Sequence, residues 1–334
     1  MSINLKIGII GLGVGEAHLR SYQQIPNVEV MSVCDVDPAR LKLIADNYNI
    51  GGRYTDSKFI TEDPNIDIVS ICSYDNFHAE QLISCFRNGK HVMVEKPVVL
   101  FKEDAEEVVR EWKDSKCKIT SNLILRESPR FKNIKNMILK NDFGEIYHIE
   151  GDYLHNILHK ITDGWRGKMP FYSTVYGGGI HLIDLMRWLM NDEVKEVCAM
   201  GNSILTKDTN YKYPEIMTSL LQFGRGATGK NTATYGPQRT KFHSLNIFGT
   251  KKSYVNHRGN GEIFSGDSEN DLLLDSTPYP GFVKGDLLPE FISSIRQGVD
   301  HPVTGEDIFR VMDVCFAIWE SYNKKKTVEV SYVL

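Results

Sequence analysis

The sequence lacks any long hydrophobic run: among its 334 residues, no apolar stretch approaches the roughly 18 residues that span a bilayer. Its beginning lacks the basic segment, apolar core and cleavage site of a secretory signal peptide. An excess of positive charge is also lacking, because lysine and arginine are scattered and the formal net charge is -4. We therefore expect a cytoplasmic protein that binds neither membranes nor nucleic acid.

Cysteine is scarce, and its spacing excludes the common cysteine motifs. The six cysteines include no CxxC pair, and several lie inside apolar runs. We expect buried, reduced thiols and no metal centre. The six residues are Cys34, Cys72, Cys85, Cys117, Cys198 and Cys315.

The first third of the sequence alternates between two periodicities. Short apolar runs at residues 5–10, 28–34, 67–72 and 91–95 predict strands, and the stretches between them predict helices. Strands this apolar, alternating with helices, predict a doubly wound parallel sheet covered on both faces. The length of 334 residues argues for a second domain, and a hydrophobic content of 41% is typical of a globular protein with a sizeable core.

The second part of the sequence has a different texture. Strand-like runs follow one another with turns between them, which predicts a mainly antiparallel sheet, with one helix at residues 179–190. The polar, turn-rich residues 265–286 predict a surface loop, and Thr304 and Asp307 have the spacing of a capping box at the start of the last helix. We expect an α/β protein with domains at residues 1–121 and 122–334.

A glycine-rich stretch, "GIIGLGVGEAHL", joins the first predicted strand to the first predicted helix. That context is typical of a dinucleotide-binding turn, although the spacing G-x-G-x-G is one residue shorter than the usual G-x-G-x-x-G. Gly11 allows the tight turn, Gly13 lets the backbone approach a pyrophosphate, and Gly15 allows the helix to pack closely on the strand. A purely structural turn is the competing interpretation.

Asp35 closes the second predicted strand, 20 residues beyond Gly15. A carboxylate at this place accepts hydrogen bonds from the adenosine ribose and repels a 2′-phosphate, which favours NAD over NADP. Arg40 is near enough in sequence to leave NADP open.

The stretch "VMVEKPVVL" places Lys96 directly after the strand at 91–95. A lysine there projects from the carboxyl edge of the sheet, where open α/β folds bind their ligands. Pro97 restricts the backbone of Lys96 and permits a cis peptide bond.

Two further patterns imitate known motifs. "GRGATGKN", residues 224–231, is close to a P-loop, but Asn231 stands where Ser or Thr must contact Mg²⁺, so we expect a strand, a turn and a strand. His155 and His159 have the i, i+4 spacing of metal ligands, but the glutamate of a zinc hydrolase motif is missing. We therefore expect no metal here, and either histidine could contact substrate. The aromatic and basic segment around them suits a polar ring and includes Tyr153, Trp165, Arg166, Tyr172 and Tyr176.

The chain resembles the Gfo/Idh/MocA family of oxidoreductases, named after glucose–fructose oxidoreductase and inositol dehydrogenase. The resemblance is carried from end to end by "GIIGLGVGEAHL", "VCDVDPARL", "HVMVEKPVVL", "NLILRESPRF", "GEIYHIEGDY", "WRGK", "GGGIHLIDLMRWL" and the closing "HPVTGEDIFRVMDVCFAIWESYNKKKTVEV". It implies an N-terminal Rossmann domain, then an α/β domain with a large open sheet that binds substrate and forms dimers or tetramers. The family's loop ends in G-x-x-H, which Gly15 and His18 keep, so NAD binding is still expected.

The resemblance also implies roles for single residues. Arg126 matches the start of the family's second domain and is an expected substrate contact. Tyr153 and Tyr176 are also expected substrate contacts, because of the aromatic content of their segment and not because of the resemblance. Expected cofactor contacts, besides the glycine loop and Asp35, are Ser73, His78, Glu95, Lys96, Trp165 and Arg166.

The catalytic helix departs from the family. Typical members carry D-x-x-x-H, and alignment makes His181 the histidine while the aspartate falls on Gly177. Asp184, three residues after His181, could orient the imidazole instead or be structural. The implied reaction is hydride transfer between nicotinamide and a secondary alcohol of a sugar, inositol or nucleotide sugar. His181 would take the hydroxyl proton and Lys96 would stabilise the developing alkoxide.

Two other functions stay open at this point. Some relatives are NAD-dependent glycosidases that transfer a hydride only transiently, and a few are sensors that bind cofactor or sugar without turnover. Net production of NADH separates a dehydrogenase from both.

Overall fold

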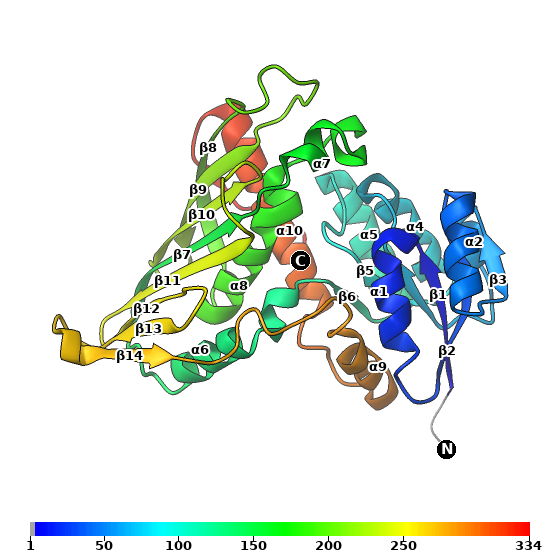
Figure 1. The fold of residues 1–334 in the computed structure, drawn as a ribbon, viewed down its shortest axis with the longest axis horizontal. Helices are drawn as coiled ribbons and strands as arrows, with labels where there is room; N and C mark the ends of the chain where they lie inside the picture. The colour runs from blue at the N-terminus through cyan, green and yellow to red at the C-terminus, as the bar shows by residue number, and fades with distance from the viewer. Residues whose placement is uncertain (1–3) are drawn as a thin grey trace. The chain divides into compact units, whose positions relative to one another are not determined.

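The computed structural model describes residues 4–334, which divide into two compact units (Figure 1). The first unit contains the described residues up to Asn122, residues 283–310 and the last two residues. The second contains residues 123–282 and 311–332. The division after Asn122 lies close to the boundary expected from the sequence, but residues 283–310 group with the first unit although the sequence placed them in the second domain.

The first unit is built on a six-stranded parallel sheet of order β3-β2-β1-β4-β5-β6. Its inner strands are buried because their side chains are almost all apolar; Ile7, Ile9 and Val69 are completely inaccessible. The strand order reverses beside β1, so the carboxyl ends of β1 and β4 form the switch point at which such sheets bind ligands. The strands are β1 (Leu5–Ile10), β2 (Val28–Cys34), β3 (Gly52–Tyr54), β4 (Ile68–Ile71), β5 (His91–Val94) and β6 (Ile119–Ser121).

Helices alternate with these strands, as the periodicity predicts, and the doubly wound sheet is confirmed. They are α1 (Leu12–Tyr22), α2 (Pro38–Asn47), α3 (Lys58–Thr61), α4 (His78–Arg87) and α5 (Lys102–Ser115). A later helix, α9 (Leu288–Gln297), packs against α1. The Ser21 hydroxyl donates to the Gly285 carbonyl at 2.9 Å, and Thr120 Oγ1 lies 3.0 Å from His301 Nδ1, which ties residues 283–310 to this unit.

The second unit is built on a nine-stranded sheet of order β14-β13-β12-β11-β7-β10-β9-β8-β15. Among the described strands of this sheet, only the β7–β10 pair is parallel, so the expected large, mainly antiparallel sheet is confirmed. The strands are β7 (Ile146–Leu154), β8 (Val194–Asn202), β9 (Ile216–Phe223), β10 (Thr228–Thr234), β11 (Phe242–Gly249), β12 (Ser253–Val255), β13 (Gly261–Phe264), β14 (Leu272–Asp275) and β15 (Val328–Glu329).

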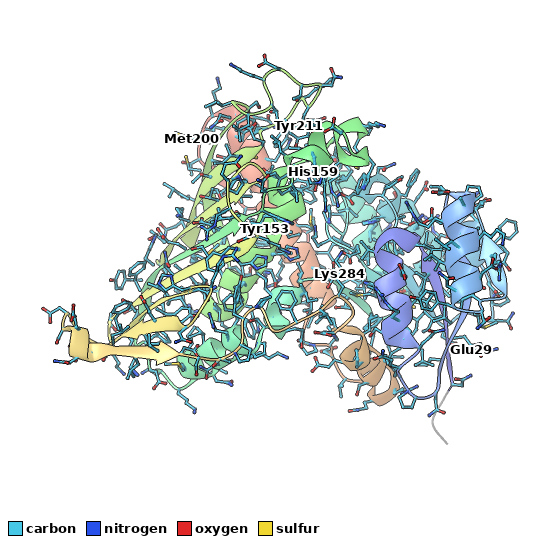
Figure 2. The ribbon with its side chains drawn as sticks, in the orientation of Figure 1. Glu29, Tyr153, His159, Met200, Tyr211 and Lys284 are labelled. Atoms are coloured by element: carbon cyan, nitrogen blue, oxygen red, sulfur yellow. The ribbon has the colours of Figure 1, made fainter. Side chains whose placement is uncertain are left out.

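Helices pack on one face of this sheet, along β7 and β8 (Figure 1). The helix α8 (Ile180–Met190) lies against β7, and Ser321 of α10 (Gly305–Lys324) accepts a hydrogen bond from the Ala199 amide of β8. On the other face, side chains of β8 and β9 such as Met200 and Leu220 are exposed; Met200 is labelled in Figure 2. The remaining helices of the unit are α6 (Pro129–Leu139) and α7 (Leu158–Thr162).

One sequence prediction is wrong. Residues 265–286, expected to be a surface loop, contain β14, which pairs with β13. The strand has only four residues, its Leu273 and Leu274 are exposed at the sheet edge, and polar turn formers surround it, so no periodicity marks it in the sequence.

The predicted start of the last helix is confirmed. Thr304 and Asp307 form the expected capping box at the start of α10, with Asp307 N donating to Thr304 Oγ1 at 3.1 Å and Thr304 N donating to Asp307 Oδ2 at 3.0 Å. Residues 224–227 form the turn between β9 and β10, and residues 228–231 begin β10, which is the expected strand, turn and strand. All six cysteines are free thiols, and all but Cys198 are buried. Within the described part of the chain, no helix combines the length and apolar character that crossing a membrane requires.

Candidate active site

The glycine loop between β1 and α1 has the shape that its three glycines suggest. Gly11 has a φ of 86°, and a Cβ there would overlap the Cys72 carbonyl. A Cβ on Gly15 would stand 2.8 Å from Ile9 Cγ2, so this glycine lets α1 pack directly on β1. A Cβ on Gly13 would meet nothing within 4 Å. The open space beside Gly13, at the amino end of a helix, is what a bound pyrophosphate requires.

Asp35 lies at the end of β2 and is buried. Its Oδ2 accepts a hydrogen bond from the Leu12 amide at 2.7 Å, and its Oδ1 accepts one from the Asp37 amide at 2.9 Å. Arg40 Nη1 lies 3.7 Å from Oδ2. The carboxylate therefore joins the β2 end to the glycine loop, and Arg40 offsets part of the negative charge that would repel a 2′-phosphate.

Glu95, at the end of β5, is a buried carboxylate held by neighbours from separate segments. Asn122 Nδ2 donates to Glu95 Oε1 at 2.8 Å, and His18 Nε2 lies 3.5 Å from the same oxygen. Burial alone would raise the pKa of Glu95, but the hydrogen bond and charge of His18, with the charges of Lys96 and Lys284, lower it to about 2. Glu95 is thus ionised, and His18 links the glycine loop to the turn that carries Lys96.

Lys96 follows this carboxylate, and its bond to Pro97 is cis. The turn is held by His78, whose Nδ1 donates to the Pro97 carbonyl at 2.8 Å and whose Nε2 lies 3.3 Å from the Ser73 carbonyl. The Ser73 hydroxyl donates to Gln81 Oε1 at 2.7 Å. Ser73 and His78 therefore have structural partners, and their expected contacts with the cofactor stay predictions.

His181 stands in the first turn of α8, directly after a π-helix, η4 (Val175–Gly179). Such π-turns are rare and are frequent at functional sites. His181 is mostly buried, and its ring stacks on Tyr153 of β7, with ring centroids 6.1 Å apart and an interplanar angle of 22°. Tyr153 is labelled in Figure 2. His243 of β11 contacts both rings, at 6.4 Å from His181 and 5.6 Å from Tyr153.

The three glycines before His181 let other elements approach the helix backbone. A Cβ on Gly177 would overlap the hydroxyl oxygens of both Tyr172 and Tyr235. A Cβ on Gly178 would lie 2.5 Å from the Tyr153 ring, and one on Gly179 would lie 2.8 Å from Asn231 Oδ1. The position where the family carries aspartate is therefore filled by two phenol groups, which are buried and lie 3.1 Å apart, oxygen to oxygen.

Trp165 and Arg166 lie in η3 (Trp165–Lys168), beside these tyrosines. The Arg166 guanidinium stacks over the Trp165 ring at 4.4 Å, and its Nε donates to the Tyr172 hydroxyl at 3.0 Å. The structure thus joins Arg166 to the tyrosine pair next to the His181 helix.

Asp184 is completely buried and forms an ion pair with Arg126 of η2 (Ile124–Glu127). Arg126 Nε donates to Asp184 Oδ2 at 2.9 Å and Nη2 donates to Oδ1 at 2.5 Å. This bidentate ion pair connects η2 to α8. It supports the interpretation that Asp184 stabilises the fold and does not orient His181. Tyr176 packs edge-on against Phe171 and Phe316 in an aromatic cluster of the core, where burial raises its pKa well above the ordinary value.

Several residues of this site were not predicted. His243 is one: Tyr279 Oη accepts a hydrogen bond from the His243 amide at 2.9 Å and also lies 2.9 Å from His243 Nδ1. Burial and Lys241 lower the pKa of His243 well below its ordinary value, so this ring is neutral. Tyr235 and Lys284 were also missed. His243 lies within β11, Tyr235 follows β10 and Lys284 lies in a loop, and no motif in the sequence surrounds them.

His155 and His159, which have the spacing of metal ligands in the sequence, lie in different surroundings. His155 Nδ1 lies 3.0 Å from the Tyr153 hydroxyl, which places His155 beside the stacked rings of Tyr153 and His181. His159 lies on α7 and is labelled in Figure 2. Within residues 4–334, no group of three His, Cys, Asp or Glu side chains could hold a metal ion.

The doubly wound sheet, the glycine loop at its switch point and Asp35 define a protein of the nucleotide-binding Rossmann class. Two family models match this chain: "Oxidoreductase family, NAD-binding Rossmann fold" over residues 5–123, and "GFO/IDH/MocA C-terminal domain" over residues 131–255. The chain belongs to the GFO/IDH/MocA family of NAD-binding oxidoreductases.

Similar proteins agree with this assignment. The chain is 27% identical to a myo-inositol 2-dehydrogenase of Thermotoga maritima, over 99% of this chain and 100% of that one. A levoglucosan dehydrogenase solved with NADH superposes with a TM-score of 0.88 at 23% identity, covering 98% of this chain and all of the other. A scyllo-inositol dehydrogenase of Lactobacillus casei, solved with NAD(H) and scyllo-inositol, gives a TM-score of 0.83 at 22% identity, covering 98% and 99%. At these identities the two structures establish a shared fold.

Proposed function

We propose that this protein is an NAD-dependent dehydrogenase that oxidises a secondary alcohol of a sugar, inositol or nucleotide sugar, or reduces the corresponding ketone. The observation that carries the proposal is the retention of both chemical groups of the family, Lys96 and His181, in a chain whose glycine loop still offers open space for a pyrophosphate. The similarity to dehydrogenases of inositols and of levoglucosan supports this substrate class.

The first unit supplies the residues that would hold NAD. A Cβ on Gly13, at the start of α1, would meet open space in which a pyrophosphate would bind, and Asp35 would accept hydrogen bonds from the ribose. Ser73, His78, Glu95 and Lys96 are the further contacts of this unit proposed from the family pattern. Trp165 and Arg166, which belong to the second unit, are proposed from the same pattern. The bound nicotinamide supplies the hydride chemistry, while the protein orients the reactants and moves the proton.

His181 and Lys96 carry the proposed proton chemistry. In oxidation, the C–H bond breaks with its electron pair and a carbonyl forms, so the hydroxyl proton must leave. His181 takes that proton at its imidazole, and the positive charge of Lys96 stabilises the negative charge that develops on the oxygen. In reduction, the protonated imidazole returns the proton to the carbonyl oxygen.

The substrate region of the second unit suits a polar ring. Tyr153, His155 and His243 provide aromatic faces with polar edges, and Lys241 lies 5.7 Å above the Tyr153 ring. We propose that such a ring, with or without an anionic substituent, binds against these residues. We further propose a cytoplasmic homodimer or homotetramer.

The test is a panel of sugars, inositols and nucleotide sugars, each assayed with NAD and with NADP for formation of reduced nicotinamide. We expect net reduction of NAD with at least one polyol. The Lys96→Ala variant is expected to lose turnover by about 100-fold or more while still binding NAD, because the lost charge acts mainly on the transition state. The exposed Lys113→Ala on α5 is the matched control.

Two outcomes contradict the proposal. If the wild-type protein binds NAD and a sugar but forms no reduced cofactor with any substrate, it is a sensor or a glycosidase; release of sugar from a glycoside separates these two. If NADP is strongly preferred, the proposed role of Asp35 is wrong.

A further inference from the structure

A second imidazole, that of His243, lies beside His181 in the second unit. His243 of β11 is the register partner of Tyr153 of β7, so these two side chains lie on the same face of the sheet. His181 of α8 stacks on the same Tyr153 ring. The ring centroids of His181 and His243 are 6.4 Å apart, and those of Tyr153 and His243 are 5.6 Å apart. Three separate elements thus bring two imidazoles together beside one phenol ring.

The His243 ring is held through one of its nitrogens and through its backbone. Tyr279 Oη accepts a hydrogen bond from the His243 amide and lies 2.9 Å from Nδ1, and Asn256 Nδ2 donates to the His243 carbonyl at 2.8 Å. Arg130 supports both of these holders, since its guanidinium stands over the Tyr279 ring at 5.4 Å and its Nη1 donates to Asn256 Oδ1 at 3.1 Å. The protein therefore fixes this imidazole before any ligand binds.

The other ring nitrogen, Nε2, is left for a partner from outside the protein. It forms no hydrogen bond with any residue that the structure describes, and it is not one of the buried polar atoms there that lack a partner. His243 is only 4% exposed, so its small accessible area includes Nε2. A buried ring that keeps one polar atom accessible suits a ligand that replaces water at that atom.

The chemistry of Nε2 suits a hydroxyl group. Burial and the charge of Lys241 lower the pKa of His243, so the ring is neutral and Nε2 is either an N–H donor or a lone-pair acceptor. The contact between Nδ1 and the Tyr279 hydroxyl is compatible with both tautomers. An alcohol hydroxyl both donates and accepts, so it pairs with Nε2 in either tautomer, whereas a carboxylate only accepts.

Resting on the proposed function, we propose that His243 determines substrate specificity: its Nε2 hydrogen-bonds a second hydroxyl of the substrate, on a carbon next to the one oxidised at His181. Tyr279 is the positioning residue that holds the imidazole. Each ring reaches a hydroxyl oxygen at a hydrogen-bond distance of about 2.7–3.2 Å, so rings 6.4 Å apart converge on neighbouring carbons. Hydride and proton leave only from the first carbon and its oxygen, and the second hydroxyl is unchanged. The favoured substrate is therefore a vicinal diol, and not an isolated secondary alcohol.

The experiment measures kcat/KM on the full chain for the best polyol of the panel and for its two deoxy analogues, each lacking the hydroxyl on one neighbouring carbon. We expect the wild type to prefer the polyol over one analogue by about tenfold or more, because that analogue leaves Nε2 unpaired. His243→Asn keeps a polar group at the level of Nδ1 but has none at Nε2. We expect it to lose this preference, by a fall in kcat/KM for the polyol and a change of less than about threefold for that analogue.

Two further variants separate binding from structure. His243→Gln has an amide at the level of Nε2 and should recover part of the preference. Tyr279→Phe should weaken the preference by less than His243→Asn does, and should have no further effect on it in the His243→Asn background. The preference is a ratio measured on one protein sample, so a loss of folded protein in any variant leaves it unchanged.

His148→Asn is the matched control. His148 is another histidine of the sheet whose Nδ1 contacts a hydroxyl, at 2.7 Å from Thr228 Oγ1. It lies on β7 five residues before Tyr153, so its side chain is on the opposite face. We expect it to keep the wild-type preference for the polyol and the wild-type dissociation constant for NAD.

The outcomes distinguish the role of His243 from the proposed function. A wild-type enzyme that oxidises a polyol, with a His243→Asn variant that keeps the preference within about twofold, overturns the role of His243 and leaves the proposed function standing. A wild-type enzyme that oxidises both deoxy analogues as well as the polyol does the same. A wild-type protein that turns over no polyol contradicts the proposed function and the role of His243 together.

Discussion

At the scale of single residues, the glycine loop assigns different tasks to glycines that look alike in the sequence. Position 11 requires glycine, because a φ of 86° is unfavourable for other residues and the nearby Cys72 carbonyl leaves no room for a side chain. Gly13 lies within α1 and next to open space, so nothing in the protein itself requires it. We therefore predict that glycine at position 13 serves the binding of a ligand, the pyrophosphate of NAD, and not the fold.

This difference gives a matched pair of variants. Gly11→Ala is expected to destabilise the fold by about 2 kcal/mol or more, as strained backbone and overlap add together. Gly13→Ala is expected to leave stability unchanged or raise it by up to about 1 kcal/mol, because alanine favours a helix. Its affinity for NAD should nevertheless fall by about tenfold or more. Urea unfolding and calorimetric titration with NAD measure the two effects.

The control for this pair is Gly51→Ala. Gly51 also faces open space, with no atom within 4 Å of a Cβ, but it lies outside the loop, between α2 and β3. It should change NAD affinity by less than about twofold. Unchanged NAD binding in Gly13→Ala would mean that this loop is a structural turn.

At the scale of elements, the start of α10 is predicted from four residues of sequence and can be tested by itself. Thr304→Ala removes the hydroxyl that accepts from the Asp307 amide, and is expected to lower the free energy of unfolding by about 1 kcal/mol. Thr304→Ser keeps the acceptor and should restore most of that loss. Urea unfolding of the three proteins measures the effect, and equal stability of the alanine and serine variants would count against the cap.

The helices and strands also differ in how well they could be predicted from the sequence. The parallel strands of the first unit are found from apolar runs because both faces of each strand are buried, and α8 is found at the residues where the sequence predicts a helix. The four-residue β14 and the return of residues 283–310 to the first unit are set by tertiary contacts, such as the bond from Ser21 to Gly285, that leave no local pattern.

The tyrosine pair shows the same limit inside the site. Tyr172 and Tyr235 are 63 residues apart, and only the fold brings their hydroxyls to Gly177. Comparison with the family pattern shows from the sequence that position 177 lacks the usual aspartate. It does not show which side chains occupy the space of the missing carboxylate. Arg126 and Asp184 are a similar case, since the sequence left Asp184 with two roles and the fold supplies its ion-pair partner.

At the scale of the whole molecule, folding stability is linked to the protonation of Glu95, which joins β5, the glycine loop through His18, and Asn122 after β6. The pKa of this carboxyl is lowered from 4.5 to about 2, against the opposing effect of burial. Between these two pH values the unfolded chain binds a proton that the folded protein does not. The stabilisation is therefore complete above about pH 4.5 and is lost as the pH falls towards 2.

Glu95→Gln tests this linkage. The shift corresponds to roughly 3 kcal/mol of stability at neutral pH, since each pKa unit is worth about 1.4 kcal/mol. We expect the free energy of unfolding of the wild type, measured in urea, to fall more steeply than that of the variant between pH 5 and pH 3. The difference between the two proteins should shrink over that range. Glu29→Gln, an exposed residue of β2 labelled in Figure 2, should follow the wild-type slope. Parallel curves for Glu95→Gln and wild type would show that Glu95 is not held ionised by its neighbours, and that His18 has no electrostatic part in joining the glycine loop to the turn of Lys96.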